Sequence, residues 1–354
     1  MPLVANSNLP TFKRLQEEGE TVLSPDRAAH QDIRELHVGL LNMMPDAALA
    51  ATERQFFRLV GESNQIAQFH MHPFSIPQLE RSPEGEAHIE QYYETFDQVK
   101  RDGLDALIIT GANVTHPDLS QEPFWDPLKD VMHWAYNNVT STICSCLATH
   151  AAMEFQHGQK RYRLPAKRWG VFGHEVIDRK HPLVNDVNTL FDVPHSRFNE
   201  ISKAQFEAAG LHVLAESKEA GVHMAVSRDK FRIIFFQGHP EYDINSLLKE
   251  YKREINRFVN GARNDYPPFP ENYFSLQVQA VFTEYRDKLL GATAKGEPPP
   301  EFPEKLVAGL LHNTWHDTAE AVINNWIGKV YQITNNDRKL PFMDGVDPNN
   351  PLGL

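Results

Sequence analysis

Short apolar runs alternate with amphipathic stretches along residues 35–260 of the chain. Each short run has the length of a strand, and each longer stretch repeats its apolar residues every three or four positions, as one face of a helix does. The predicted strands are Glu35–Asn42, Gln65–His72, Leu104–Thr110, Thr140–Ser145 and Phe231–Gln237, and the predicted helices start at Thr52, lie within Ser82–Asp102, and cover Phe124–Asn137 and Leu147–Phe155. This alternation predicts an α/β fold, a mostly parallel sheet with helices on both faces.

The flanking segments have a different composition. Residues 1–34 are polar and predict an N-terminal arm with a short helix that packs over the surface. Residues 35–335 predict a single α/β domain, and residues 336–354 predict a C-terminal tail. Two proline-rich segments flank a helix predicted over Tyr273–Leu290, so we expect a helical insertion near 266–302.

The remaining segments carry weaker patterns. Residues 157–200 predict loops and short strands, including a polar turn at Asp192–Arg197 with three side chains that could contact a ligand. The other predicted elements are a hairpin-like strand pair at Leu211–Glu216 and Gly221–Ser227, helices over Ile244–Asn260 and Leu306–Ile327, and a short extended piece at Val330–Thr334. The last of these helices is rich in Trp and His, and it is a candidate contact surface for a second copy of the chain.

Composition limits the classes of partner. The 354 residues carry a formal net charge of −12, which argues against nucleic acid and anionic membranes. No apolar run approaches the length of a membrane span, and the first residues show no secretory pattern, so we expect a cytoplasmic protein. The two cysteines are too close in sequence for an unstrained disulfide and lack the companions of a zinc site. We therefore expect no metal site.

Cys146 stands where a predicted buried strand meets a predicted helix. A side chain on such a turn is presented at the carboxyl end of the sheet, near the free N–H groups of the helix. Those groups can stabilise an oxyanion, so Cys146 is a candidate nucleophile. The alternative is a buried structural cysteine, since free cysteine is among the most buried residue types.

His239 and Glu241 follow the last predicted core strand, in the sequence Gly-His-Pro-Glu. A thiol nucleophile needs a base, and the base needs an orienting acid. Because parallel strands place their carboxyl ends at one edge, Cys146, His239 and Glu241 are predicted to converge as a triad. A purely structural His-Pro-Glu turn is the alternative.

Taken together, these motifs resemble the homoserine O-acyltransferases of the MetA type. The matching segments are Leu40–Pro45, Thr110–Ala112, Thr140–Thr142 with Cys146, Lys167, Pro194–Arg197, Gly238–Asp243 and Val330–Thr334. That family has a flavodoxin-like fold similar to class I glutamine amidotransferases, with a Cys–His–Glu site. The resemblance implies a homodimer that needs acyl-CoA only as a co-substrate.

The resemblance also implies roles for individual residues. Cys146 would carry the acyl group as a thioester, His239 would act as general base, and Glu241 would orient it. Lys167, Ser196 and Arg253 fall on positions for substrate recognition. Read without the family, Lys167 could be a solvated member of a basic loop, and Arg253 an ordinary ion-pair residue on a helix.

The choice of acyl donor depends on Thr115. In the family, Gly at this position accompanies succinyl-CoA and Glu accompanies acetyl-CoA, because a Glu would repel the distal carboxylate of succinate. Thr is neutral and small, which favours succinyl. Two nearby positions depart from the family pattern: Asp46 stands where a lysine is usual, and Asn113 stands where a proline is usual.

The leading hypothesis is an enzyme that transfers succinyl from succinyl-CoA to L-homoserine by a ping-pong route, at the start of methionine biosynthesis. Transfer of acetyl from acetyl-CoA is the close alternative, and serine is an alternative acceptor. A glutaminase-like amidohydrolase and a non-catalytic binding protein are more distant ones. The basic residues between Lys160 and Arg168 are candidates for contacting the CoA phosphates.

Overall fold

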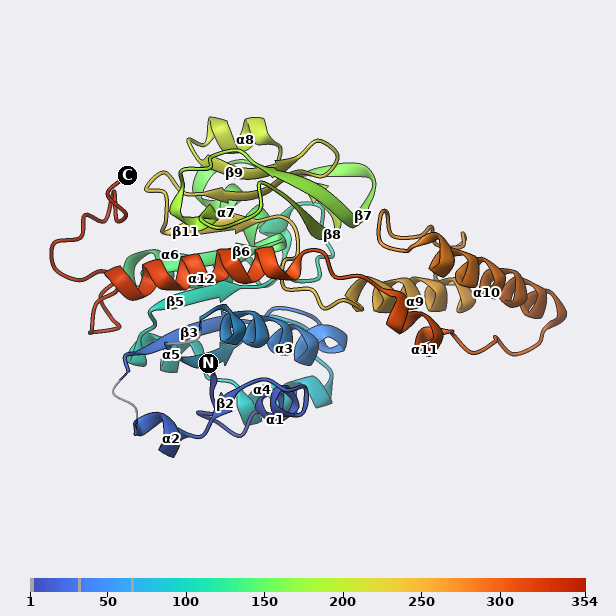
Figure 1. The fold of residues 1–354 in the computed structure, drawn as a ribbon, viewed down its shortest axis with the longest axis horizontal. Coiled ribbons are helices and arrows are strands. Elements are labelled where there is room, and N and C mark those ends of the chain that lie inside the picture. The colour runs from blue at the N-terminus through green and yellow to red at the C-terminus, as the bar shows by residue number, and fades with distance from the viewer. Residues whose placement is uncertain (1–2, 31–32, 65–66) are drawn as a thin grey trace.

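The computed structural model describes residues 3–30, 33–64 and 67–354. Within these ranges the strands form one eleven-stranded sheet, ordered β2-β1-β4-β3-β5-β6-β11-β10-β9-β7-β8. Figure 1 shows helices in front of and behind this sheet, with a second group of helices projecting from one side. The predicted α/β fold, with a mostly parallel sheet and helices on both faces, is confirmed.

The half of the sheet from β2 to β11 is parallel. Its strands are β2 (Val22–Leu23), β1 (Leu3–Val4), β4 (Gln68–Phe74), β3 (Glu35–Leu41), β5 (Ala106–Ile109), β6 (Ser141–Ser145) and β11 (Ile233–Phe236). The five predicted strands that alternate with helices all appear here. The predicted second strand began at Gln65, and residues 65–66 lie outside the described residues. Because these strands are parallel, their carboxyl ends meet at one edge of the sheet.

The other half of the sheet is antiparallel. It contains β10 (Gly221–Val226), β9 (His212–Ser217), β7 (Tyr162–Val176) and β8 (Leu190–Glu200). The hairpin-like pair is confirmed as β9 and β10. The expectation of loops and short strands over 157–200 is wrong, because β7 and β8 span fifteen and eleven residues. The polar side chains of this pair hid its strand pattern, since strands at the margin of a sheet can expose much of their surface.

Two helices, α3 (Asp46–Ser63) and α12 (His316–Ile333), share a core with one face of the sheet. The helices α5 (Phe96–Asp102), α6 (Trp125–Asn138) and α7 (Leu147–His157) share a core with the opposite face. Successive side chains of β3 point to opposite faces of the sheet, so Leu40 lies in the first core and Leu41 lies in the second. The shorter helices are α1 (Pro10–Glu17), α2 (Pro25–Ala29), α4 (Pro83–Tyr92) and α8 (Lys203–Ala208).

Two predicted boundaries at these helices are wrong. The helix predicted from Thr52 begins at Asp46, because the intervening Ala-rich run is itself helical. The extended piece predicted at Val330–Thr334 is instead mainly the last turn of α12, where Val330 is fully buried. Trp315 and Trp326 are also buried, at 2% and 0% exposure, so they offer no contact surface to a second copy.

The N-terminal residues do more than lie over the surface. β1 and β2 extend the parallel sheet beyond β4, and Phe12 and Leu15 of α1 are buried in the core beneath α3. The short helix predicted in this segment is present as α1, and this part of the chain is integrated into the sheet.

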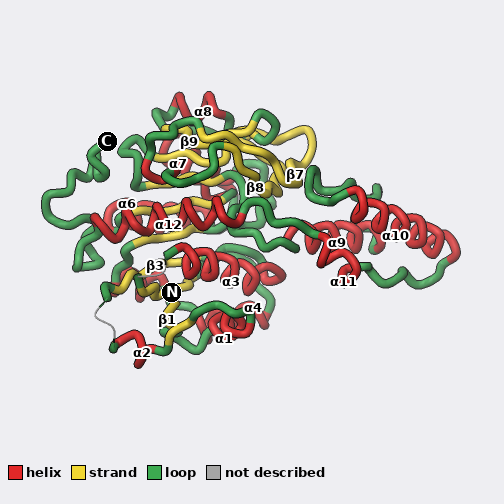
Figure 2. Tube along the Cα trace, in the orientation of Figure 1, coloured by secondary structure: helices red, strands yellow, loops and turns green. Residues whose placement is uncertain are grey.

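The helical projection has a core of its own. It comprises α9 (Ser246–Val259), α10 (Leu276–Lys295) and the short α11 (Glu304–Val307), which extend away from the sheet in Figures 1 and 2. Aromatic side chains dominate its interior, among them Tyr251, Phe274 and Phe282. The helix predicted over Tyr273–Leu290 is present as α10, shifted by three residues at its start. Among the described residues, no helix combines the length and apolarity that crossing a membrane requires.

Candidate active site

Cys146 occupies a strained turn between β6 and α7. Its φ is +52° and its ψ is −106°, in a region that side chains other than glycine rarely adopt. The turn is held by β11, because the Cys146 amide donates to the carbonyl of Phe236 at 2.7 Å. Thr149 reinforces it by donating its hydroxyl to the same carbonyl at 2.9 Å. Strain that is fixed by surrounding bonds is typical of functional sites, and here it presents the thiol at the carboxyl edge of the sheet.

His239 and Glu241 reach the same edge from the end of β11. His239 Nδ1 lies 2.8 Å from Glu241 Oε1, and both side chains are almost fully buried. The His239 amide donates to the Pro194 carbonyl at 2.8 Å, which fixes the turn against β8. Gly238 permits this approach, because a Cβ there would lie 2.5 Å from Val193 Cγ1. The residue before the base must therefore be small.

The charged groups beside His239 favour its protonated form. Burial alone would lower the pKa of His239, but the charges of Glu241 and Cys146 and a hydrogen bond to the Cys146 side chain together raise it well above its ordinary value. Since Glu241 occupies Nδ1, the bond to sulfur uses Nε2. The arrangement favours a protonated imidazole beside the Cys146 sulfur.

Cys144 is chemically different from Cys146, although it lies only two residues away. It is completely buried in β6, and burial raises the pKa of its thiol to about 12. A thiol of that pKa remains protonated at neutral pH and is a poor nucleophile. The structure thus separates a packing cysteine, Cys144, from the candidate nucleophile, Cys146.

Backbone groups beside Cys146 suit an oxyanion. The amide of Leu147 is the first of α7 and has no acceptor within the helix. The Gly111 backbone lies opposite, where an added Cβ would sit 3.8 Å from Cys146 Cβ and 3.9 Å from the Leu147 nitrogen. A carbonyl attacked by the thiol would place its oxygen beside these groups.

A second polar group adjoins the triad and centres on Glu250 of α9. Its Oε2 accepts from Lys167 Nζ at 3.0 Å and from Ser196 Oγ at 2.7 Å, and its Oε1 accepts from the Tyr242 hydroxyl at 2.8 Å. Burial would raise the pKa of Glu250, but Lys167, Ser196 and Tyr242 together hold it below its ordinary value. The Tyr242 ring stacks on His239 with centroids 4.4 Å apart, which joins this group to the triad.

The structure brings Lys167 and Ser196 together but leaves Arg253 outside their network. Arg253 lies on the next turn of α9, with 58% of its side chain exposed and its Nε 3.9 Å from Glu254 Oε1. Thr115 lies on an exposed loop after β5. Its amide donates to Glu122 Oε1 at 2.7 Å, and the hydroxyl lies 3.0 Å from His116 Nδ1. Glu122 is buried and so fixes the course of this loop.

The segment from Asp192 to Arg197, expected to be a polar turn with three ligand-contacting side chains, is part of strand β8. His195 is fully buried, and Arg197 is buried in an ion pair with Glu200 at 3.0 Å. Alternation along the strand leaves Ser196 as the side chain directed to Glu250. The expectation is therefore wrong for His195 and Arg197, whose roles are structural.

The sequence alone does not single out Glu250, Tyr242 or Arg81. Tyr242 lies inside the matching segment Gly238–Asp243 and Glu250 follows it, but only the packing of α9 against β7 and β8 reveals their bonds. Arg81 is 5% exposed, donates to the Met44 carbonyl and pairs with Asp46 at 3.2 Å. It therefore supplies a positive charge beside the loop in which the family's usual lysine is absent.

The basic residues after α7 have different partners. Lys160 pairs with Asp118 at 2.7 Å and Glu154 at 3.3 Å. The half-buried Arg161 donates Nη2 to the His116 carbonyl at 3.2 Å, and its Nε is buried without a hydrogen-bond partner. Among the described residues, the one group of three potential metal ligands is Glu35, His37 and His70, at the opposite edge of the sheet.

Comparison with known proteins decides the family. A sequence model described as homoserine O-succinyltransferase matches residues 2–336. Proteins named homoserine O-succinyltransferase from Allochromatium vinosum and Nitrosococcus oceani are 69% and 67% identical to the whole chain, and each match covers 99% of the relative. The chain belongs to the homoserine O-succinyltransferase family. The resemblance read from its motifs is thereby confirmed.

Among solved structures, a glutamine amidotransferase from Thermotoga maritima is 11% identical, with a TM-score of 0.45 over 84% of this chain and 98% of its own. The homoserine O-succinyltransferase relatives match along their full lengths, so the family assignment covers the sheet and the helical projection alike.

Proposed function

We propose that this chain transfers a succinyl group from succinyl-CoA to the hydroxyl of L-homoserine through a thioester on Cys146. The observation that carries the proposal is the strained Cys146 turn hydrogen-bonded to the buried His239–Glu241 pair, in a chain whose full-length relatives are named homoserine O-succinyltransferases. The expected place of this reaction is the first committed step of methionine biosynthesis.

The first half-reaction acylates the enzyme. The Cys146 thiolate attacks the thioester carbonyl of succinyl-CoA, and the Leu147 amide with the Gly111 backbone stabilises the oxyanion. Collapse of the tetrahedral intermediate breaks the bond to the CoA sulfur, which leaves with the proton held by His239. The products are CoA and a succinyl thioester on Cys146, with His239 neutral.

The second half-reaction transfers the acyl group. Neutral His239 accepts the proton of the homoserine hydroxyl, whose oxygen attacks the Cys146 thioester. The intermediate then expels the Cys146 thiolate, which restores the thiolate–imidazolium pair and releases O-succinylhomoserine. Glu241 keeps the His239 ring oriented in both half-reactions, because its bond to Nδ1 leaves Nε2 directed at the reacting atoms.

The network around Glu250 is the proposed acceptor site. Homoserine carries an ammonium and a carboxylate. Glu250 would pair with the ammonium, and Lys167 would pair with the carboxylate. Their 3.0 Å ion pair would open so that each group takes its substrate partner. Ser196 contributes a hydroxyl within this site. Arg253 remains a proposed second partner for the carboxylate and would need to turn from its exposed position.

Recognition of the donor is assigned to Thr115 and Arg161. Thr115 is a small, exposed side chain on its loop. Arg161 donates to the carbonyls of His116 and Pro117, the two residues after Thr115, at 3.2 and 3.4 Å. Burial lowers the pKa of Arg161, while the charges of Glu154, Glu122 and Cys146 raise it, so Arg161 lies within electrostatic range of the nucleophile. A guanidinium there suits the distal carboxylate of a succinyl group, and acetyl has no such group.

Intact-protein mass spectrometry after mixing with each acyl-CoA tests both the nucleophile and the donor. We expect one succinyl adduct on the parent chain and on Cys144→Ala, and none on Cys146→Ala. Discharge of the adduct by homoserine, but not by serine, would identify the acceptor. Preferential labelling by acetyl-CoA would contradict the succinyl assignment, and glutamine hydrolysis without acyl-CoA would favour an amidohydrolase.

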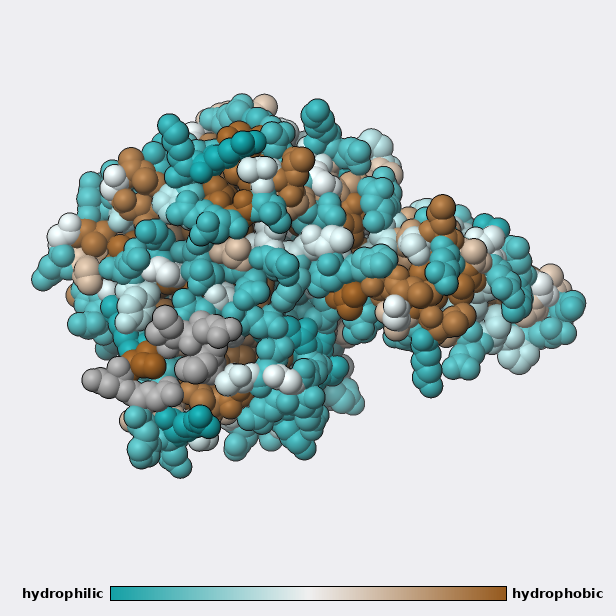
Figure 3. Space-filling model, in the orientation of Figure 1, coloured by the Kyte–Doolittle hydropathy of each residue, from teal (hydrophilic) through white to brown (hydrophobic). Residues whose placement is uncertain are grey.

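We also propose a homodimer in the cytoplasm. Support for the dimer comes from apolar side chains on the helical projection, where Leu276 is 85% exposed and Leu306 is 64% exposed. Figure 3 shows an apolar patch over this projection. Sedimentation of the full chain tests the proposal, since Leu276→Glu combined with Leu306→Glu should yield monomers if the projection forms the interface.

A further inference from the structure

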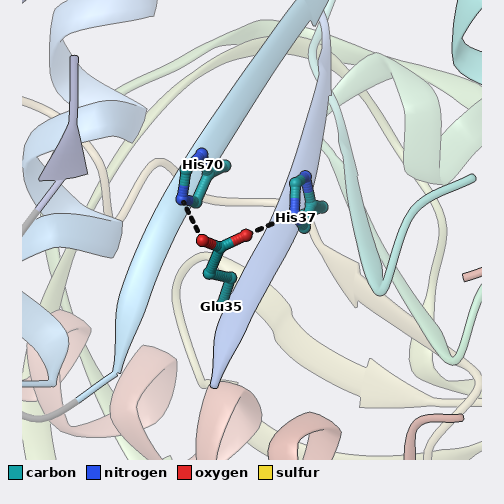
Figure 4. A group of neighbouring side chains, drawn as sticks. All are labelled: Glu35, His37 and His70. Carbon is teal, nitrogen blue, oxygen red and sulfur yellow. Dashed lines mark ion pairs between the residues drawn. The ribbon is translucent and has the colours of Figure 1, made fainter. Parts of the chain in front are cut away.

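Three potential metal ligands lie together at the amino ends of β3 and β4. His37 and His70 are direct cross-strand neighbours in the parallel register, and Glu35 precedes His37 by two residues on the same face. Figure 4 shows the Glu35 carboxylate between the two imidazole rings. Sequence analysis did not reveal this group, because only the pairing of the two strands makes the three residues neighbours.

The distances suit a single ion. Glu35 Oε2 lies 3.5 Å from His37 Nε2, and Glu35 Oε1 lies 3.7 Å from His70 Nε2. One potential ligand atom from each residue lies within 4.8 Å of those of the other two. Ligand atoms around a tetrahedral zinc ion are about 3.4 Å apart, so small side-chain movements would complete the geometry. His70 Nε2 is buried without a hydrogen-bond partner, which leaves a ligand atom unused.

A chain of hydrogen bonds orients His37. Its Nδ1 lies 2.8 Å from His72 Nε2, and His72 Nδ1 lies 2.6 Å from Glu94 Oε1. The carboxylate accepts from His72 Nδ1–H, so His72 Nε2 accepts from His37 Nδ1–H. This tautomer leaves a lone pair on His37 Nε2. Carboxylate–histidine support of this kind is the usual outer arrangement around a metal-ligating imidazole.

The guanidinium of Arg338 already donates a hydrogen bond to this lone pair. Arg338 Nη1 lies 2.6 Å from His37 Nε2, and Arg338 Nε donates to the Asp102 carbonyl at 3.1 Å. Arg338 belongs to the segment after α12, far from β3 in sequence. An ion on His37 Nε2 and this guanidinium exclude each other.

We propose that Glu35, His37 and His70 bind a divalent transition-metal ion of the zinc class, in competition with Arg338. Two imidazoles and one carboxylate favour Zn²⁺, Ni²⁺ or Co²⁺ over Mg²⁺ and Ca²⁺, which prefer oxygen ligands. Water would complete the coordination. The site lies at the opposite ends of the strands from Cys146, so it is separate from the chemistry of the triad, and binding would release Arg338 from the sheet.

Titration of the full-length chain with Zn²⁺ tests the proposal. A Cys146→Ala background removes the catalytic thiol as a competing ligand, and Co²⁺ absorption reports the ligand geometry. We expect one ion per chain, and at least about tenfold weaker binding in His70→Ala and in Glu35→Gln. His133→Ala, which changes an exposed histidine of α6, is the matched control and should bind as the background does.

Arg338→Ala separates this site from adventitious binding. Removal of the competing cation should tighten Zn²⁺ binding about tenfold, the equivalent of one charged hydrogen bond. Arg101→Ala, at an exposed position on α5, controls for the loss of positive charge. Unchanged affinity in both Arg338→Ala and Glu35→Gln would overturn the proposal. Because Glu35 is exposed, its substitution does not depend on whether a core variant folds.

Discussion

Histidines are paired with carboxylates at both ends of the parallel strands, with opposite electrostatic results. At the carboxyl end, the charges of Glu241 and Cys146 outweigh burial and raise the pKa of His239 well above its ordinary value. At the amino end, burial together with His72, Arg338 and His70 lowers the pKa of His37 to about 2. The first histidine holds a proton beside the proposed nucleophile, and the second keeps a lone pair beside a cation. The charges around a buried histidine therefore decide whether it holds a proton.

The largest expected effect is at the nucleophile. Cys146→Ala should lower kcat on the order of 10⁴-fold or more, because no other described thiol reaches the site. Cys144→Ala is the matched control and should retain activity within a few-fold. Steady-state assays with succinyl-CoA and homoserine measure both. Substantial turnover in Cys146→Ala would remove the thioester route.

The next effect concerns the proton on His239. Glu241→Gln removes a charge that raises the pKa of His239, and burial then lowers that pKa. Since the folded pKa of the parent is raised, its imidazolium persists as pH rises above 6.5, and in Glu241→Gln it should be lost at lower pH. NMR titration of the imidazole measures the shift, and kcat should fall on the order of 10²–10⁴-fold. An unchanged titration would mean that Glu241 does not set the charge of His239.

A smaller effect is expected at the acceptor network. Glu250→Gln removes the charge that meets Lys167, so the KM for homoserine should rise about 10–100-fold. Acylation by succinyl-CoA should change far less, because it precedes binding of the acceptor. Glu216→Gln removes the ion-pair partner of Lys203 on β9, away from this network, and serves as the control. Equal losses of rate in acylation and in transfer to homoserine would indicate that Glu250 supports the fold and does not bind the acceptor.

The smallest effect on turnover is expected at the amino ends of the parallel strands. Thr334 donates its hydroxyl to the buried Asp105 at 2.8 Å, and Asp105 also accepts from the His37 amide. Thr334→Val should reduce the free energy of unfolding by about 1–3 kcal/mol, since one acceptor loses its partner. Its kcat/KM should stay within about twofold. Chemical denaturation and the same activity assay measure the two quantities, and a large loss of turnover would show that the two ends are coupled.

Local patterns were enough to predict the five central parallel strands and the convergence of Cys146, His239 and Glu241, but not β1 and β2. Each of those predictions depends on a short apolar run and the turn after it, and the carboxyl ends of parallel strands meet by geometry. The long strands β7 and β8 were missed because their side chains lack a clear apolar alternation. Glu250 was missed for another reason: it resembles any charged residue on a helix until β7 and β8 bring Lys167 and Ser196 against it.

The carbonyl of Pro194 links the proposed base to the proposed acceptor site. It holds the His239 amide, while the next side chain but one along β8, Ser196, belongs to the acceptor network. The proposed base, His239, and the proposed acceptor site are therefore both held by one segment of β8. A displacement of β8 would move both of them together. Because a carbonyl makes this link, every amino acid at position 194 supplies it. The alignment of base and acceptor can thus persist through sequence divergence without leaving a conserved side chain as its trace.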